Sequence, residues 1–350
     1  MSDPSAAKTS HDSPTFRSVL AKALTRRRSL IEPGKNRALR AFSGGADGVE
    51  GVYVDIYGAG AVLVVYEGQS PRWFNPDEQA AVVLEVFHPI GVRAIYVKPF
   101  GKDRSKLGGE LPEILSEPTP AAGEALPEAI LIEELDWKLE VRLYDGLSTG
   151  LFFDQRENRG FVARWVKGRI AGAGGALGAA PAVLNTFAYT CAFSVAAAKS
   201  GAITTSVDVS ARYLEWGKRN FAHNAIDPAL HRFAKMDTFE FFGYAKRKRL
   251  KYDMIILDPP SFSTGSKKKG IPAWSSTADF APLIAEAAAL LNPKGVILAS
   301  TNTRELCRPG KLEREIVKGL GREPRYMRLP AAPVDVAGEK ERFAACAFGV

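Results

Sequence analysis

The sequence contains few cysteines, and their spacing fits neither disulfides nor zinc ligands. Cys191, Cys307 and Cys346 are the three cysteines among 350 residues, and no CxxC motif or Cys/His pair accompanies them. This pattern predicts no disulfide framework and no metal site, as in a reducing cytoplasm. The chain also lacks an apolar run near the roughly 18 residues of a membrane span. Its polar amino terminus has no apolar core of a signal peptide, so we expect a cytoplasmic protein without a membrane or metal partner.

Residues 1–40 are polar and basic, which predicts a flexible lead-in. They contain one short candidate helix, Phe16–Leu24, followed by three consecutive arginines at 26–28. An arginine-rich start is also typical of organelle transit peptides, although Asp3 and Asp12 count against that interpretation.

The chain is basic, with a formal net charge of +8 at pH 7. An excess of positive charge is typical of proteins that bind a polyanion such as nucleic acid. Many soluble proteins are mildly basic without such a partner, so the charge alone leaves both interpretations open.

Residues 41–127 predict a small α/β domain. Two strand-like runs between Gly51 and Gly68 are joined by a tight turn, which is typical of a β-hairpin. A helix is predicted at 77–87 and another strand at 93–99. The stretch 112–127 is rich in Pro, Glu and Ala without periodicity, and we interpret it as a linker.

Residues 128–350 predict a larger domain of the α/β class. After Pro181 the strands are predicted at 183–187, 203–207, 231–235, 253–257 and 295–300, and the helices between them at 191–199, 211–224, 238–246 and 280–291. Such alternation predicts a parallel sheet with helices on both faces. The closing strands, at 325–329 and 342–348, are expected to run antiparallel because their connection is short.

Acidic residues follow three successive strands of this predicted sheet. Asp208, Asp237 and Asp258 come after its second, third and fourth strands. Ligands of doubly wound folds bind beyond the carboxyl ends of strands, where a carboxylate can accept both hydroxyl protons of a ribose. Capping of the next helix is the common alternative for any one acid. Three of them in one sheet predict a nucleoside-type cofactor.

Four sequence motifs resemble one known family. They are TGLFFDQRENR (149–159), LNTFAYTCAFSVAAAKSGA (184–202), SVDVSARYLEWGKRNFAHN (206–224) and ILDPPSFS (256–263). From Gly44 to Val350 the chain resembles class I S-adenosylmethionine-dependent methyltransferases of the bacterial 23S ribosomal RNA large-subunit type. The resemblance implies a Rossmann-like, seven-stranded methyltransferase domain with a smaller α/β central domain that is RNA-binding-like, and S-adenosyl-L-methionine as the cofactor. The likeness is greatest to the branch that methylates guanine N7. A branch that methylates cytosine C5 is a relative, and its amino-terminal RNA-binding domain is expected to be absent here.

The resemblance also implies a cofactor site. Its residues are Phe152, Gln155, Arg156, Asn185, Phe187, Tyr189, Asp208, Asp237 and Asp258. Asp208 would hold the ribose and Asp237 the adenine. Arg156 would pair with the methionine carboxylate of the cofactor or form a salt bridge inside the domain. Cys191 stands where the family usually has glycine, so its side chain is expected to crowd the approach to the cofactor.

Asp258, Pro259 and Phe262 are the implied catalytic residues at the target base. A carboxylate and a carbonyl can bind the edge of a flipped base, and an aromatic ring can stack on its face. A rigid Pro-Pro turn with Phe262 in the core is the structural alternative. Lys267, Lys268 and Lys269 follow the loop directly and predict contacts with RNA phosphates. Asn302 is expected to bind a guanine edge or to cap the next helix.

The presence or absence of a cysteine near the site indicates which atom of the base accepts the methyl group. Cytosine C5 is a poor nucleophile and requires attack by a cysteine, which in the cytosine branch follows the strand matching 295–300. No thiol stands there in this sequence, and Cys307 lies several residues further on. A ring nitrogen needs only correct placement, so we predict a nitrogen acceptor, most simply in guanine of 23S ribosomal RNA. Cytosine C5 methylation through Cys307 and a non-catalytic RNA-binding role are the alternatives, and a monomer and a homodimer both remain open.

Overall fold

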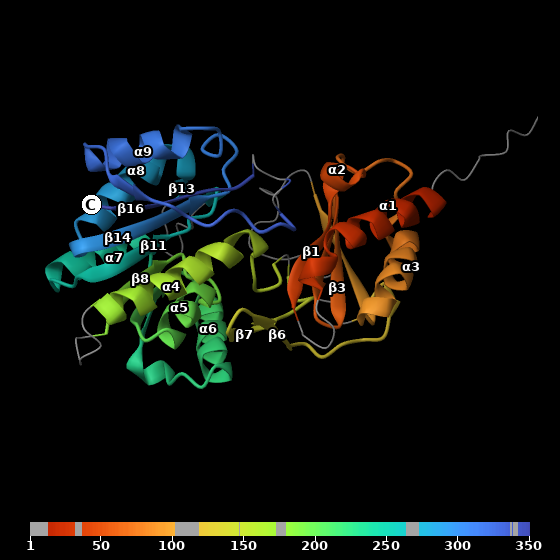
Figure 1. Ribbon diagram of the computed structural model, residues 1–350, viewed down its shortest axis with the longest axis horizontal. Coiled ribbons are helices and arrows are strands. Elements are labelled where there is room, and N and C mark those ends of the chain that lie inside the picture. The colour runs from red at the N-terminus through yellow and green to blue at the C-terminus, as the bar shows by residue number, and fades with distance from the viewer. Residues whose placement is uncertain are drawn as a thin grey trace, which may run out of the picture. The chain divides into compact units, whose positions relative to one another are not determined.

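The computed structural model describes residues 13–31, 37–101, 119–146, 148–172, 180–263, 273–336, 338 and 342–350. The chain divides into two compact units (Figure 1). The first unit contains Met1–Ile132, Val141–Thr149 and Val334–Gly338, and the second contains Glu133–Glu140, Gly150–Pro333 and Glu339–Val350.

The first unit is built on a five-stranded sheet with the order β1-β2-β3-β4-β5. Its strands are β1 (Ala38–Ser43), β2 (Val52–Tyr57), β3 (Gly60–Tyr66), β4 (Ala94–Phe100) and β5 (Ala122–Gly123). Its helices are α1 (Ser13–Arg26), η1 (Arg28–Leu30), α2 (Gly44–Asp47), α3 (Pro76–Phe87) and η2 (His88–Ile90). The predicted hairpin is β2–β3, and the crossover through α3 makes β3 and β4 parallel. Asn75 caps α3 by accepting a hydrogen bond from the Asp77 amide at 3.1 Å.

The amino-terminal segment differs from the predicted flexible lead-in. Residues 13–26 form α1, whose Phe16 and Leu20 are fully buried in the core of the first unit. The Phe16 ring packs edge-on against Phe42 and Phe74, with centroids 5.7 and 5.0 Å away. The helix predicted at 16–24 is therefore present, but it packs in the core of the first unit and is not part of a flexible lead-in. Its apolar residues are sparse, and their stabilising effect comes from the sheet on which they pack.

Replacement of Phe16 by alanine should therefore destabilise the first unit. Loss of a buried phenyl ring leaves a cavity and costs about 3 kcal/mol of unfolding free energy. Urea unfolding monitored by circular dichroism measures this loss, and Arg17→Ala is the matched control because Arg17 lies on the exposed face of the same helix. Equal midpoints for Phe16→Ala and the wild type would contradict the packing of α1.

The second unit contains a seven-stranded sheet with the order β10-β9-β8-β11-β14-β16-β15. Its strands are β8 (Ala182–Thr186), β9 (Ile203–Asp208), β10 (Arg232–Lys235), β11 (Tyr252–Leu257), β14 (Leu291–Thr301), β15 (Arg325–Met327) and β16 (Ala344–Gly349). The first five strands in sequence are parallel, and β16 is antiparallel to both β14 and β15. The α/β class and the antiparallel closing strands are as predicted from the sequence.

Helices cover both faces of this sheet (Figure 1). They are α4 (Arg156–Gly172), α5 (Ala192–Lys199), α6 (Ala211–His223), α7 (Thr238–Arg247), α8 (Ser276–Ala288) and α9 (Lys311–Leu320), with η5 (Phe153–Gln155) before α4 and η6 (Pro228–Leu230) after α6. Two short hairpins, β6 (Ile130–Glu134) with β7 (Trp137–Val141) and β12 (Phe262–Ser263) with β13 (Trp274–Ser275), complete the described elements.

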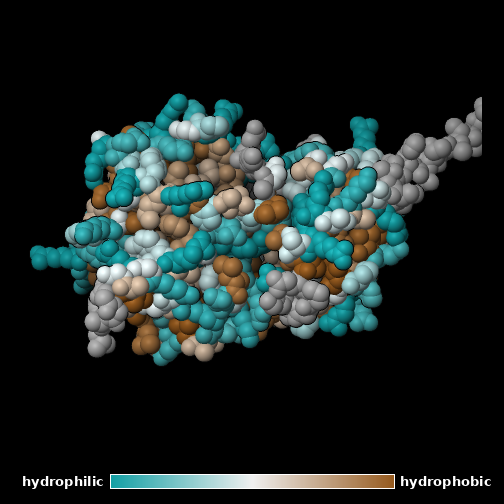
Figure 2. Space-filling model, in the orientation of Figure 1, coloured by the Kyte–Doolittle hydropathy of each residue, from teal (hydrophilic) through white to brown (hydrophobic). Residues whose placement is uncertain are grey.

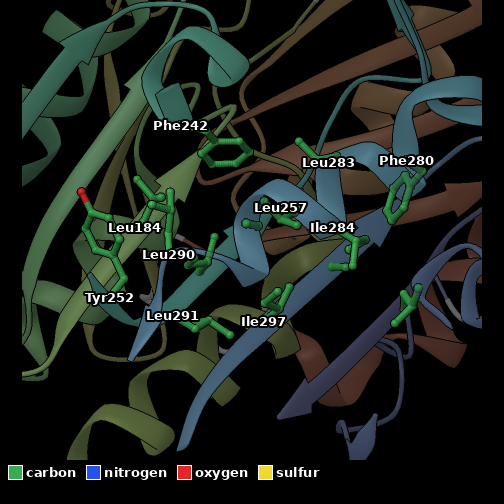
Figure 3. Close-up of a cluster of buried hydrophobic side chains, with 14 of the residues drawn as sticks. Leu184, Phe242, Tyr252, Leu257, Phe280, Leu283, Ile284, Leu290, Leu291 and Ile297 are labelled. Atoms are coloured by element: carbon green, nitrogen blue, oxygen red, sulfur yellow. The ribbon is translucent and has the colours of Figure 1, made fainter. Parts of the chain in front are cut away.

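Strand β11 contributes side chains to the hydrophobic clusters on both faces of the sheet. Ile255 and Leu257 pack with α7, α8 and α9 in the cluster of Figure 3, whereas Met254 and Ile256 face α4 and α5. Successive side chains of a strand point to opposite faces. A strand in the middle of such a sheet is buried on both faces and therefore needs a continuous apolar run. Residues 254–257 of β11 form such a run.

The visible surface of both units mixes hydrophilic and hydrophobic residues (Figure 2). None of the helices in the described ranges is long and apolar enough to cross a membrane.

Candidate functional site

The candidate site lies at one edge of the seven-stranded sheet, in the second unit. Strands β9, β8 and β11 are adjacent and parallel, with Val207 paired to Thr186 and Thr186 paired to Leu257. Their carboxyl ends therefore meet, so that Asp208 and Asp258 lie at the same edge, on either side of β8. This is the edge at which doubly wound folds bind ligands.

Asp208 is held in place by two backbone amides. Its Oδ2 accepts a hydrogen bond from the Tyr189 amide at 2.9 Å, and its Oδ1 accepts one from the Ser210 amide at 2.8 Å. Burial raises the pKa of Asp208, and these two hydrogen bonds partly oppose the rise. The result is a fixed carboxylate with acceptor capacity left on both oxygens, which suits a ribose diol.

The loop after β8 has an unusual backbone. Phe187, Tyr189 and Cys191 have φ angles of 53°, 48° and 62°, in the left-handed region that side chains other than glycine disfavour. Each such residue costs about 1–2 kcal/mol, and strain of this kind gathers at ligand sites. The hydrogen bond from the Tyr189 amide to Asp208 helps to hold the loop in this conformation.

The side chain of Cys191 points into the protein, which corrects the expectation that it crowds the cofactor. Cys191 is fully buried, and its Sγ would lie 2.4 Å from a Cβ added at Gly217 of α6. The thiol thus packs where the helix has no side chain. Burial raises the pKa of Cys191 to about 12, which leaves the thiol protonated.

The backbone conformation of the TGLFF segment (149–153) requires a glycine at position 150. Gly150 has a φ of +103°, and a Cβ at this position would lie 2.5 Å from the ring of Trp216. Its carbonyl accepts a hydrogen bond from Thr190 Oγ1 at 2.7 Å, which ties the segment to the strained loop. Phe152 follows, 48% exposed, with its ring centroid 5.5 Å from that of Tyr189. These two predicted cofactor residues are therefore neighbours.

Arg156 contacts an acid of its own unit. Its Nε lies 3.9 Å from Glu134 Oε2, which fits the alternative of an internal salt bridge. Arg159, which the sequence analysis did not single out, binds Glu134 more closely with two hydrogen bonds of 2.5 and 2.6 Å. Arg159 also donates to the Phe152 carbonyl at 3.0 Å. It thereby fixes the backbone near the end of the TGLFF segment, whereas a contact of Arg156 with the cofactor stays a prediction.

Three other predicted cofactor residues have partners inside the fold. Asn185 is buried and donates to Ser194 Oγ at 2.9 Å, so it holds α5 against β8. Asp237 caps α7 by accepting a hydrogen bond from the Phe239 amide at 2.8 Å. Gln155 is 2% exposed and donates to Ser300 Oγ at 2.8 Å. Direct contacts of these three side chains with the cofactor stay predictions.

Asp258 follows β11 and contacts the neighbouring strand. Its Oδ1 accepts a hydrogen bond from Ser300 Oγ of β14 at 2.7 Å. Burial raises the pKa of Asp258, while hydrogen bonds from Ser300 and Gln155 and the charge of Arg159 act in the opposite direction. Ser300 could not be predicted as the partner of Asp258, because a serine at the end of an apolar strand carries no signal of its own.

The loop after Asp258 is anchored on both sides. The Pro260 carbonyl accepts hydrogen bonds from Trp274 Nε1 at 2.7 Å and from Ser276 Oγ at 2.8 Å. Ser261 Oγ donates to Asn302 Oδ1 at 2.6 Å, so Asn302 is placed beside the loop. These hydrogen bonds hold Pro260 and Ser261 in place, which lowers the cost of ordering them when a ligand binds.

Phe262 lies on the surface of this loop. It is 56% exposed, whereas Pro259 is buried. An exposed ring next to a fixed carboxylate suits stacking on a base, and the alternative that Phe262 is a core residue was wrong. Lys267, Lys268 and Lys269 lie outside the described residues, so their contacts with RNA stay predictions.

Comparisons with known proteins identify the family of the chain. A family model described as S-adenosylmethionine-dependent methyltransferase matches residues 119–319. The Bacillus subtilis protein YwbD, which is named as a ribosomal RNA large subunit methyltransferase, is 37% identical over 294 residues, covering 83% of this chain and 67% of YwbD. Ribosomal RNA large subunit methyltransferase K/L of Legionella pneumophila is 36% identical over 255 residues, covering 72% of this chain and 32% of that enzyme. The chain thus spans about a third of that second relative.

A solved structure shows the same fold with a ligand related to the cofactor. It is the crystal structure of a protein described as a methyltransferase, in complex with S-adenosylhomocysteine. The TM-score is 0.77 at 29% sequence identity, and the match covers 96% of this chain and 81% of that chain.

Proposed function

Since the chain belongs to the S-adenosylmethionine-dependent methyltransferase family, we propose that it methylates a base nitrogen of guanine in 23S ribosomal RNA. The protein is a methyltransferase and its cofactor is S-adenosyl-L-methionine, as the sequence motifs implied. The relatives named for ribosomal RNA large subunit methylation support the RNA substrate. The guanine nitrogen is supported by the chemistry of the site.

One observation carries the proposal: the fixed carboxylate of Asp258 and the exposed ring of Phe262 stand in one anchored loop, at the sheet edge that also holds Asp208. S-adenosylmethionine supplies an electrophilic methyl group. An ionised carboxylate only accepts hydrogen bonds, and guanine offers adjacent N–H donors from N1 and N2 on one edge. A base held by this edge, with its face on Phe262, is fixed in position without any covalent bond to the protein.

The environment of Cys307 disfavours the cytosine C5 alternative. Its Sγ donates to the Thr301 carbonyl at 3.5 Å, and burial raises its pKa to about 11. The thiolate is the nucleophile in cytosine C5 methylation, and near pH 7.5 such a thiol is almost entirely protonated. Guanine N7, the acceptor in the branch that the sequence resembles most, has a free lone pair and requires neither a thiolate nor removal of a proton.

We expect Cys307→Ser to retain methyl transfer within about twofold of the wild type, because the thiol would have no chemical role. The rate is measured from incorporation of label from S-adenosylmethionine into RNA, and denaturing electrophoresis tests for a protein–RNA adduct. Cys346→Ser is the matched control, since that cysteine lies in β16 and its thiol is also protonated, with a pKa raised by burial to about 12. Loss of activity in Cys307→Ser together with a trapped adduct in the wild type would favour cytosine C5.

The product identifies the acceptor atom directly. Ribosomal RNA from a strain that lacks the gene is incubated with the protein and S-adenosylmethionine, digested to nucleosides and analysed by mass spectrometry. A methylated guanosine supports the proposal, and 5-methylcytidine or no RNA product contradicts it. Naked RNA and ribosomal particles are compared as substrates in parallel.

Three other expectations stay predictions: the cytoplasmic localisation, the RNA-binding role of the first unit, and the choice between monomer and homodimer.

A further inference from the structure

A line of hydrogen bonds runs from α4 to Asp258 through buried side chains. Asn158 Nδ2 donates to Gln155 Oε1 at 2.8 Å, Gln155 Nε2 donates to Ser300 Oγ at 2.8 Å, and Ser300 Oγ donates to Asp258 Oδ1 at 2.7 Å. Asn158, Gln155 and Ser300 are 5%, 2% and 0% exposed. Water has little access to these groups, so the side chains themselves must satisfy one another.

The direction of this line is set by the charge of Asp258. An ionised carboxylate has no proton to donate, so the hydroxyl of Ser300 must donate to it. The Ser300 oxygen is then available as the acceptor for Gln155, whose own carbonyl accepts from Asn158. The backbone carbonyl of Leu257, at 3.4 Å from Ser300 Oγ, is a poorer alternative acceptor. The arrangement is therefore complete when Asp258 is ionised.

We propose that Ser300 is a positioning residue, which keeps Asp258 ionised and aimed at the donor edge of the target guanine. This inference rests on the proposed function, in which Asp258 accepts hydrogen bonds from the base. Gln155 orients the Ser300 hydroxyl, and Asn158 orients Gln155. A serine at the end of β14 thus acts on the base through the acid that follows β11.

The surroundings of Asp258 explain why such a donor is needed. Burial raises the pKa of Asp258, and a protonated acid would present a donor to the N–H groups of guanine. Arg159 is the positive charge that acts on Asp258 from α4, but its guanidinium is bound to Glu134 of β6. The neighbouring ends of β8 and β14 offer the neutral side chains of Thr186 and Ser300. The hydroxyl of Ser300 is the main donor, at 2.7 Å, and the side chain of Gln155 is the second donor that lowers the pKa of Asp258.

The test is the pH profile of methyl transfer by Ser300→Ala. Loss of the donor raises the pKa of Asp258, so the acid limb of kcat/KM should move up by about one pH unit. We expect up to about tenfold lower activity than the wild type well below the wild-type midpoint, and recovery toward the wild-type value on the plateau at higher pH. A defect that only loosens the fold would lower the rate at all pH values and leave the midpoint in place.

Two further variants make this result specific. Thr301→Val removes a buried hydroxyl from the next position of the same strand, where it accepts from the Thr303 amide, and it should keep the wild-type midpoint. Ser300→Cys keeps a weaker donor of similar size and should give a smaller upward shift than alanine. Both variants, and Ser300→Ala, should bind S-adenosylmethionine with wild-type affinity in calorimetry, which shows that each is folded.

Asp258→Asn distinguishes a failure of the proposed function from a failure of the proposed role of Ser300. If Asp258→Asn loses methyl transfer while folded Ser300→Ala keeps the wild-type rate and midpoint, the role of Ser300 is overturned and the proposed function stands. If Asp258→Asn retains full activity, the base contact itself is wrong, and the role of Ser300 falls with it. If folded Ser300→Ala and Ser300→Cys shift the midpoint in the expected order, the inference is supported.

Discussion

Asp208→Ala should weaken the binding of S-adenosylmethionine by about 10³-fold. The carboxylate can accept hydrogen bonds from both ribose hydroxyls, and each charge-assisted hydrogen bond contributes about 1.5–3 kcal/mol. The same oxygens bind the amides of Tyr189 and Ser210, so alanine also leaves these two donors without their acceptor. The strained loop at 187–191 then loses a contact that holds it. Isothermal titration calorimetry with the purified full chain measures the affinity.

Two variants control for this loss. Asp208→Asn keeps the size of the side chain and one acceptor oxygen, so we expect an affinity between those of the wild type and Asp208→Ala. Asp227→Ala removes a carboxylate that accepts from the Ala229 amide in η6, and it should leave the affinity unchanged. Tight binding by Asp208→Ala would place the ribose elsewhere. Absence of binding in folded wild-type protein would favour the non-catalytic RNA-binding alternative.

The order of strands and helices in the second unit could be predicted because each element has a strong local signal. The apolar run of β11 ends at two prolines, and α6 begins after Ser210, whose side chain accepts from the Tyr213 amide. Parallel strands then bring their carboxyl ends together whatever the details of the loops. The sequence therefore places Asp208, Asp237 and Asp258 at the carboxyl ends of strands of one sheet.

The contacts that give these acids their properties could not be predicted in the same way. Arg159 and Glu134 are 25 residues apart, and Ser300 is 42 residues from Asp258. Their residue types are common, and only the packing of α4 and β14 on the sheet decides which atoms meet. The backbone strain could not be predicted either, because nothing in the sequence of the loop at 187–191 indicates three residues with left-handed φ angles.

The reason for one glycine, Gly217, could not be read from the sequence motif. Gly217 lies in the middle of α6, where a glycine lowers helix stability by about 1 kcal/mol relative to alanine. The structure explains it by the thiol of Cys191, which fills the space above the helix. Cys191 and Gly217 are therefore matched in size, and the two residues should be changed together rather than singly.

Asp258→Asn should reduce methyl transfer on the order of 10³-fold or more when it is measured at a saturating concentration of S-adenosylmethionine. Asparagine has the same shape, and Ser300 can still donate to its carbonyl oxygen. Its amide nitrogen, however, turns a donor toward the N–H donors of guanine, and mismatched polar groups in a closed site are strongly rejected. Turnover is measured with ribosomal RNA as the substrate, and calorimetry with the cofactor checks that the variant is folded.

The pH dependence of the wild type gives an independent check on the charge of Asp258. Because burial raises its pKa, the acceptor form is lost as the pH falls through a value above the roughly 3.9 of an ordinary aspartate. Methyl transfer should therefore rise with pH along an acid limb that Asp258→Asn lacks. Asp279→Asn is the matched control, because that carboxylate accepts from the Ser275 amide at the start of α8 and should leave the limb in place. A limb that persists unchanged in Asp258→Asn would assign the titration to another group and contradict the contact between this carboxylate and the base.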